Sequence, residues 1–131
     1  MFKILIAEDD RELRQLFAHV LTKNGYTVLG VSNGEEALAA LEQSYYDLII
    51  SDIMMPKMDG LAVMEKFAND KSLKKIPSFI VVSAVGQERI TENAFNLGAD
   101  YYILKPFDNQ MLLNRIKHVR RAGERRIRQI G

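Results

Sequence analysis

The chain has 131 residues, 47% of them apolar, which is enough for one compact domain with a sizeable core. It contains no cysteine, which excludes a disulfide framework and thiolate metal sites. The formal net charge is +1, yet residues 115–131 carry seven basic residues and one acidic residue, so that segment is +6 and residues 1–114 are −5. With no signal peptide and no apolar run of ~18 residues, we expect a cytoplasmic protein without membrane contact.

Short apolar runs alternate along the chain with segments whose apolar residues recur at helical spacing. In the first such segment, Leu13, Phe17 and Leu21 share one helical face, and Asn24-Gly25 is a stop signal. In chain order we predict a strand at 2–7, a helix at 11–25, a strand at 26–31, a helix after 32–34, a strand at 47–51, a helix after 59–60, a strand at 79–82, a helix at about 87–97, a strand at 101–104 and a helix from 108.

Five strands alternating with five helices predict an α/β fold with a doubly wound five-stranded parallel sheet and right-handed crossovers. The strand order 2-1-3-4-5, with helices on both faces, is a common arrangement for such a chain. We assign residues 1–120 to this domain. Residues 121–131 are a basic segment that either extends the last helix or forms a linker, and the lack of aromatic residues among its arginines disfavours nucleic-acid binding by the segment alone.

Four of the apolar runs end in polar residues suited to phosphate chemistry, at Glu8-Asp9, Asp52, Ser83 and Lys105. The carboxyl ends of parallel strands share one edge, which is where ligands bind in open α/β sheets. Clustered carboxylates are costly unless a cation neutralises them, and Mg²⁺ suits carboxylates combined with a phosphate. The acidic triplet at 8–10 is also compatible with a simple helix start, but the other strand ends favour a metal site.

Asp52 is the candidate nucleophile, because a carboxylate can accept a phosphoryl group as an acyl phosphate. Lys105 would neutralise the transferred phosphoryl oxygens, and Ser83 would donate a hydrogen bond to them. The Lys105-Pro106 peptide is either a cis bond that holds the lysine or an ordinary turn before the last helix. The alternative interpretation of Asp52 is an ordinary strand-end cap, and Asp47 and Asp100 are candidates for that structural role alone.

The segments EDD, SDIMMPKMDG, VVSA and GADYYILKPF, in this order and spacing, resemble the CheY-like receiver domain of bacterial two-component response regulators. The resemblance covers about residues 2–120. It implies a flavodoxin-like fold and a signalling switch that promotes only its own phosphorylation and dephosphorylation, and so is not an enzyme. The resemblance implies that Asp52 is the phosphoacceptor and that Mg²⁺ is bound by Glu8, Asp9, Asp52 and the backbone carbonyl of Met54, with Asp10 adjacent to this group. It implies that Ser83 and Tyr102 are the switch residues. Lys105, which precedes Pro106, corresponds to the lysine of the family's phosphoryl site.

Two longer segments, at 55–67 and 83–112, resemble the receiver of the sporulation master regulators of spore-forming Firmicutes. This resemblance implies a phosphorelay that controls transcription, with a histidine kinase or histidine phosphotransferase as phosphoryl donor. It also implies DNA binding only through an output domain that is absent from this chain. A homodimer through the face of the fourth helix, fifth strand and fifth helix is a further expectation.

Two other classes of protein share parts of this pattern. A haloacid-dehalogenase-like phosphohydrolase also uses a strand-end Asp nucleophile, but it needs a second Asp two residues on, where this chain has Met54. A nucleotide-binding flavodoxin-like module would need a Gly-rich phosphate loop after the first strand, and no such loop follows residues 2–7. The sequence therefore favours a phosphorylation-controlled switch.

Overall fold

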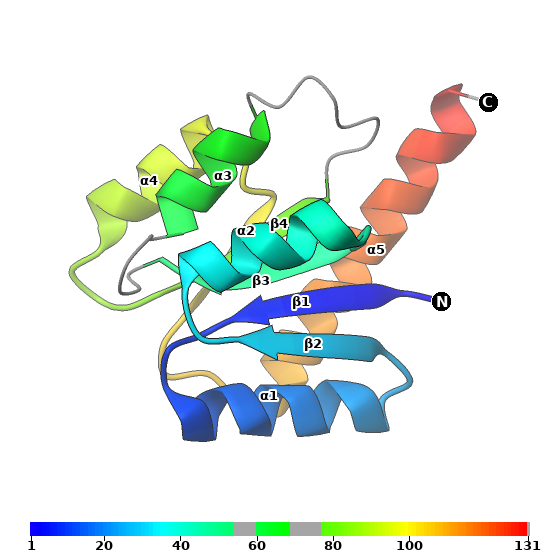
Figure 1. Ribbon diagram of the computed structural model, residues 1–131. Coiled ribbons are helices and arrows are strands. Elements are labelled where there is room, and N and C mark those ends of the chain that lie inside the picture. The colour runs from blue at the N-terminus through cyan, green and yellow to red at the C-terminus, as the bar shows by residue number, and fades with distance from the viewer. Residues whose placement is uncertain (54–59, 69–76, 131) are drawn as a thin grey trace.

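The computed structural model describes residues 1–53, 60–68 and 77–130 (Figure 1). Within these residues, five strands alternate with five helices, as predicted. In chain order they are β1 (Lys3–Ala7), α1 (Arg11–Lys23), β2 (Thr27–Val31), α2 (Gly34–Gln43), β3 (Leu48–Asp52), α3 (Gly60–Ala68), β4 (Ser78–Ser83), α4 (Glu88–Asn96), β5 (Tyr101–Leu104) and α5 (Asn109–Ile130).

The strands form one sheet in the order β2-β1-β3-β4-β5, and every neighbouring pair is parallel. This confirms the predicted fold class and strand order. The register aligns Ala7 with Ser51, so the segments that follow β1 and β3 leave the sheet side by side. Ser83 pairs with Leu104 in the same way, which brings the end of β4 next to the end of β5.

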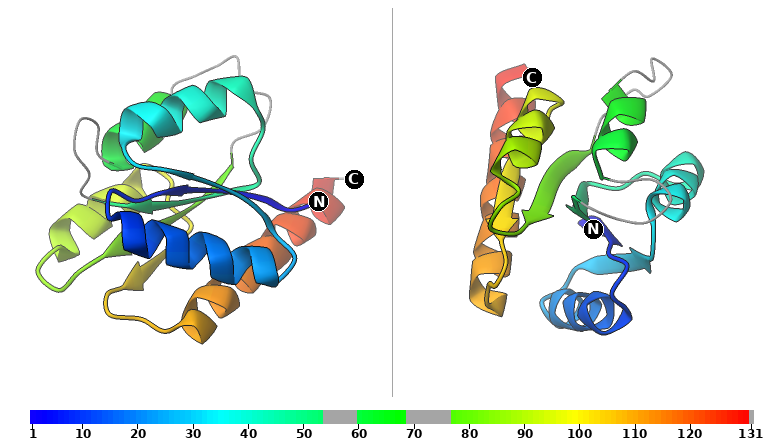
Figure 2. Two further views of the ribbon diagram at one scale, coloured as in Figure 1. Left: turned by 60° about the horizontal axis from the view of Figure 1, so that its bottom comes forward. Right: turned by 90° about the vertical axis from the view of Figure 1, so that its left-hand side faces the viewer.

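Helices cover both faces of the sheet (Figure 2). An apolar layer lies between the helices and the strands on each face. Successive side chains of a strand point to opposite faces, and β1 shows this clearly: Leu5 packs in one layer and Ile4 and Ile6 in the other, with none of their surface exposed. The first layer includes residues of α2, α3 and α4, and the second includes residues of α1 and α5. Both faces are covered, which explains why the strands read as continuous apolar runs.

The first helix begins and ends as its sequence predicts. Asp10 is its N-cap, and the Asp10 carboxylate accepts hydrogen bonds from the backbone N–H groups of Glu12 and Leu13 at 3.0 and 3.2 Å. Asn24 ends the helix, and Gly25 follows with φ of +90°, a left-handed conformation that glycine adopts without a steric penalty. These signals fix how the chain leaves β1 and returns to β2.

Helix α5 continues far past the apolar contacts that hold it to the sheet. Leu112, Ile116 and Val119 are buried, and the helical backbone then runs through the basic segment to Ile130 (Figure 1). The role of residues 121–131 as a linker stays a prediction. Among the described residues, no helix combines the length and apolar character that crossing a membrane requires.

Candidate phosphoryl and metal site

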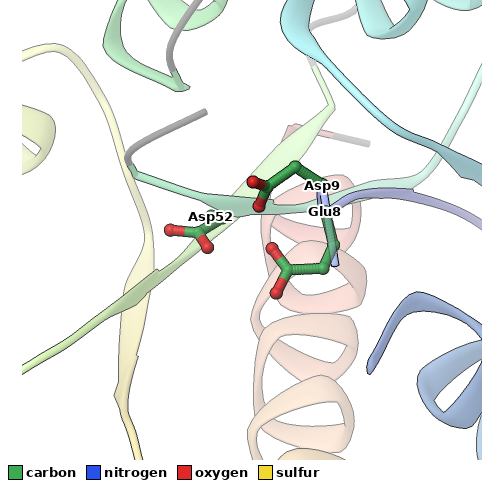
Figure 3. Close-up of side chains that lie close together, drawn as sticks. All are labelled: Glu8, Asp9 and Asp52. Atoms are coloured by element: carbon green, nitrogen blue, oxygen red, sulfur yellow. The ribbon is translucent and has the colours of Figure 1, made fainter. Parts of the chain in front are cut away.

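Three carboxylates meet at the carboxyl edge of the sheet. Glu8 and Asp9 directly follow β1, and Asp52 is the last residue of β3. Each offers a carboxylate oxygen to a group whose atoms all lie within 4.8 Å of one another. Figure 3 shows the three side chains turned toward one shared space. The strand ends that the sequence singled out are therefore neighbours in the fold, because parallel strands bring their carboxyl ends to one edge.

The three acidic residues at 8–10 have two different roles, one in the carboxylate site and one at the start of α1. Asp10 caps α1 with its carboxylate, which is the helix-start interpretation of the sequence. Glu8 and Asp9 belong to the carboxylate group beside Asp52. Glu8 is buried, with 3% of its surface exposed, whereas Asp9 is exposed. The direction in which each side chain points therefore determines whether the residue caps the helix or joins the carboxylate site.

Lys105 reaches into this group from the end of β5. Its Nζ lies 3.0 Å from Oδ2 of Asp52 and 3.6 Å from Oε1 of Glu8. The backbone N–H of Lys105 donates to the carbonyl of Ser83 at 2.8 Å, which fastens the end of β5 to the end of β4. The ammonium group is therefore held between the two carboxylates, on a side chain that is one-third exposed.

The crowding of acidic groups changes their proton affinity. Burial raises the pKa of Glu8 to about 8, with further upward contributions from its hydrogen bond with Asp52 and from the Asp52 charge, while the Lys105 charge lowers it. Burial by itself lowers the pKa of Lys105, but the hydrogen bond and charge of Asp52 and the charge of Glu8 outweigh burial and raise it. Without a bound cation, Glu8 therefore holds a proton at neutral pH, and the lysine stays charged.

Two buried polar atoms at the same edge lack a hydrogen-bond partner within the described part of the chain. They are Oε2 of Glu8 and the hydroxyl oxygen of Ser83. A buried polar group without a partner costs about 1–3 kcal/mol, so such groups are rare outside functional sites. A hard divalent cation would satisfy the carboxylate oxygen, and an oxyanion would satisfy the hydroxyl. The residues present therefore fit a Mg²⁺ ion beside a phosphoryl group.

The two tyrosines of β5 face opposite sides of the sheet, as their alternation requires. The Tyr102 ring is 40% exposed and packs edge-on against Phe95 of α4, with the ring centroids 5.8 Å apart. Tyr101 packs on the other side, against His118 and under the Arg115 guanidinium of α5. Tyr102 is therefore the aromatic that faces α4, where the predicted switch residue is expected.

The remaining predicted site residues have different outcomes. The Lys105-Pro106 peptide is cis, the first of the two alternatives considered for it. Met54, predicted to offer its backbone carbonyl to the metal, lies outside the described residues. Arg14 was not among the predicted site residues, yet its guanidinium donates a hydrogen bond to the Glu8 carbonyl at 2.7 Å. An arginine on an amphipathic helix normally indicates a solvated face, so no sequence signal pointed to this contact.

The fold and the site together define an α/β protein with a parallel sheet that carries three carboxylates and a lysine at its carboxyl edge. The family model of the response regulator receiver domain matches residues 4–117. The chain therefore belongs to this family. Receiver domains are signalling switches of two-component systems; they work with histidine kinases and are not ordinary enzymes. The acidic cluster of Glu8, Asp9 and Asp52 is consistent with the Mg²⁺ and phosphoaspartate chemistry of this family.

Solved structures agree with this assignment. The receiver domain of a signal transduction histidine kinase from Syntrophus aciditrophicus is 33% identical, with a TM-score of 0.81 over 91% of this chain and 89% of that chain. The chemotaxis response regulator CheY4 of Vibrio cholerae is 29% identical, with a TM-score of 0.83 over 91% and 98%. NtrX from Brucella abortus is 24% identical, with a TM-score of 0.87, and shares the fold; this chain covers 29% of that chain.

Proposed function

We propose that Asp52 accepts a phosphoryl group from a phosphohistidine of a histidine kinase or histidine phosphotransferase. One observation carries this proposal: the Lys105 ammonium lies 3.0 Å from the Asp52 carboxylate, at a sheet edge where Glu8 and Asp9 place two further carboxyl groups. Such an arrangement supports positioning and charge neutralisation, which are the main sources of catalysis in phosphoryl transfer. An ordinary structural ion pair would not need two more carboxylates in the same space.

In the proposed transfer, an oxygen of Asp52 forms a bond to phosphorus as the bond between phosphorus and the donor imidazole nitrogen breaks. The electron pair of that bond returns to the imidazole. Lys105 compensates the charge of the phosphoryl oxygens, since its ammonium already lies beside the acceptor carboxylate. The hydroxyl of Ser83, which has no partner among the described residues, donates a hydrogen bond to a phosphoryl oxygen.

The proposed cofactor is Mg²⁺, held by Glu8, Asp9, Asp52 and the backbone carbonyl of Met54. When bound, the ion would supply positive charge to the carboxylates and to the phosphoryl oxygens. The protein side of this proposal rests on two features: the carboxylate oxygens lie within 4.8 Å of one another, and Oε2 of Glu8 is buried without a partner in the described residues. Loss of the Glu8 proton would accompany metal binding, because a ligating carboxylate must be ionised.

The proposed output is a change of the face formed by α4, β5 and α5. Hydrogen bonding of Ser83 to the phosphoryl group would pull the segment after β4 toward Asp52 and open space for Tyr102. Tyr102 is 40% exposed and its ring packs against Phe95 of α4, so its inward rotation would alter this face. We propose that the changed face controls partner proteins or a homodimer. Any action on DNA would come from an attached output domain.

A narrower assignment rests on the sequence resemblance described above. The segments GLAV at 60–63 and AVGQ at 84–87 lie outside the phosphoryl site, so the chemistry of the site does not require their similarity to the sporulation regulators. We propose on this basis that the chain serves a cytoplasmic phosphorelay that regulates transcription. Phosphoryl transfer from a histidine phosphotransferase, faster than transfer from an unrelated histidine kinase, would support this assignment, and the reverse order would refute it.

The test of the phosphoacceptor is incubation with acetyl phosphate and Mg²⁺, followed by intact mass measurement and mapping of the modified residue. We expect an adduct of roughly 80 Da on Asp52 that disappears in Asp52→Asn and when Mg²⁺ is chelated. Asp47→Asn is the matched control, because it makes the same change at the opposite edge of the sheet and should keep the adduct. An undiminished adduct in Asp52→Asn would refute the proposal.

A turnover assay with small phosphate esters separates the switch from the rival phosphohydrolase. A phosphohydrolase would release phosphate from small phosphate esters with repeated turnover, whereas a switch keeps one phosphoryl group on one carboxylate. Backbone chemical shifts of the phosphorylated chain provide the second measurement. We expect changes that extend from Ser83 to Tyr102 and α5, and changes confined to the carboxylate loops would contradict the proposed output.

A further inference from the structure

The backbone N–H and the backbone carbonyl of Glu8 both have hydrogen-bond partners outside β1. The N–H of Glu8 donates to the carbonyl of Val31, at the end of β2, at 3.0 Å. The Glu8 carbonyl accepts a hydrogen bond from Nη1 of Arg14, which reaches back from α1, at 2.7 Å. This second contact is charge-assisted and short, and such bonds are about twice as strong as neutral ones. The chain is thus held firmly where β1 ends and the acidic pair begins.

The aliphatic stem of the Arg14 side chain (its Cγ and Cδ atoms) packs against Gly30 of β2, which has no side chain. A Cβ atom added to Gly30 would lie 3.0 Å from Cγ and 3.2 Å from Cδ of Arg14. The first distance is at the limit of what real contacts allow, so a larger residue at Gly30 would displace the stem. Gly30 pairs with Ile6 in the register of the sheet, two residues before Glu8. The missing side chain therefore leaves the space through which Arg14 reaches the Glu8 carbonyl.

We propose that Arg14 is a positioning residue for the metal site. The carbonyl that it holds belongs to the peptide unit that joins Glu8 to Asp9, and a peptide unit is planar. Fixing that carbonyl fixes the plane, and with it the directions in which the two carboxylate side chains leave the backbone. Groups that orient metal ligands without touching the metal typically change metal affinity 10–100-fold. This inference rests on the proposed Mg²⁺ site.

If Arg14 acted on Mg²⁺ binding only through its positive charge, it would weaken binding and not support it. A guanidinium near a divalent cation repels it, so removing that charge should strengthen Mg²⁺ binding. Within the described residues, Arg14 forms no ion pair with Glu8, Asp9 or Asp52, and Lys105 is the cation that pairs with Glu8 and Asp52. A loss of Mg²⁺ affinity on removal of Arg14 would therefore report the hydrogen bond to the backbone and not the charge.

The experiment is an NMR titration of the metal-free chain with Mg²⁺ at constant ionic strength, which gives a dissociation constant without phosphorylation. Arg14→Met keeps an unbranched stem and removes the donors, and we expect about a tenfold higher Kd. Arg11→Met is the matched control, because Arg11 is an exposed cation in the first turn of the same helix; its Kd should stay the same or fall slightly. Arg14→Lys should recover part of the affinity, since lysine donates but lacks the planar fork.

Gly30→Ala tests the same contact from the other side and does not alter any charged residue. We expect a higher Kd in this variant, and no further rise when it is combined with Arg14→Met, because both changes act through one hydrogen bond. Wild-type Mg²⁺ binding together with an unchanged Kd in both Arg14→Met and Gly30→Ala would overturn the inference alone. A wild-type chain without saturable Mg²⁺ binding would overturn the proposed metal site, and the inference with it.

Discussion

The two edges of the sheet use the same kind of side chain in opposite ways. At the amino edge, the Asp47 carboxylate accepts the backbone N–H of Lys3 at 2.8 Å, and the Asp47 N–H donates to the Lys3 carbonyl at 2.8 Å. Asp100 repeats this exchange with Phe79, at 2.8 and 2.9 Å. Each carboxylate thus satisfies a backbone donor of the neighbouring strand, and these two residues act as the strand-end caps that the sequence analysis considered.

At the carboxyl edge, the carboxylates face one another. Glu8 and Asp52 share a lysine, the pKa of Glu8 is raised to about 8, and buried oxygens of Glu8 and Ser83 have no partner in the described residues. Carboxylates that hold a fold together are paired with N–H groups, whereas carboxylates gathered for a ligand remain under-satisfied until it arrives. The contrast predicts that equivalent substitutions at the two edges change the free energy of unfolding by different amounts.

The largest expected effect is a pH dependence that belongs to the carboxyl edge. The pKa of Glu8 rises from the ordinary 4.5 to about 8 on folding. Below pH 4.5, Glu8 is protonated in both the folded and the unfolded chain, so its pKa shift does not change stability with pH. Between pH 4.5 and about 8, the unfolded chain has lost this proton while the folded chain still holds it. The free energy of unfolding therefore falls as the pH rises through this range. The loss is on the order of a few kcal/mol. Melting of metal-free protein between pH 5 and 8 measures it.

Glu8→Gln is the variant that isolates this effect, because glutamine has nearly the same shape as a protonated glutamate and does not titrate. Its melting temperature should change much less across the same pH range than that of the wild type. Saturating Mg²⁺ should also flatten the wild-type profile, since a bound cation replaces the proton. An equal pH slope in Glu8→Gln and the wild type would show that the Glu8 carboxyl does not cause the dependence.

The next effect concerns the caps at the amino edge. Asp100→Ala should lower the free energy of unfolding by about 1–3 kcal/mol, because it removes the hydrogen bond that the Asp100 carboxylate accepts from the backbone N–H of Phe79. Asp47→Ala should behave in the same way through Lys3. Urea denaturation measures both. Asp9→Ala, an exposed carboxylate at the opposite edge, is the control and should change stability by about 0.5 kcal/mol or less. Equal losses at both edges would remove the distinction drawn between them.

The smallest expected effect is at Ser83. Its hydroxyl is buried without a partner among the described residues, so Ser83→Ala removes no hydrogen bond and should leave the free energy of unfolding unchanged or raise it by up to about 1 kcal/mol. Ser78→Ala, at the start of the same strand, is a comparison at a half-buried position. A clear loss of stability in Ser83→Ala would mean that the hydroxyl has a structural partner in the resting protein.

Much of the architecture follows from the sequence. The alternation of short apolar runs with amphipathic segments predicts the parallel sheet, since parallel strands need helical crossovers and are buried on both faces. Predicted boundaries differ from the observed ones mainly by one or two residues: β3 runs Leu48–Asp52 instead of 47–51, because Asp47 is occupied by its exchange with Lys3. The strand ends that would meet were also predictable, because strand order determines which ends are neighbours.

Only the tertiary structure decided what each polar side chain does there. Asp10, Asp47 and Asp100 are caps, while Glu8, Asp9 and Asp52 share one space, although all six are strand-end or helix-start acids in the sequence. Hydrogen bonds and pKa values depend on distances between residues far apart in the chain, such as the 53 positions that separate Lys105 from Asp52. Sequence periodicity identifies the strands, and with them the edge of the sheet where the site lies. It carries no information on distances between residues far apart in the chain, so the atoms that form the site are known only from the tertiary structure.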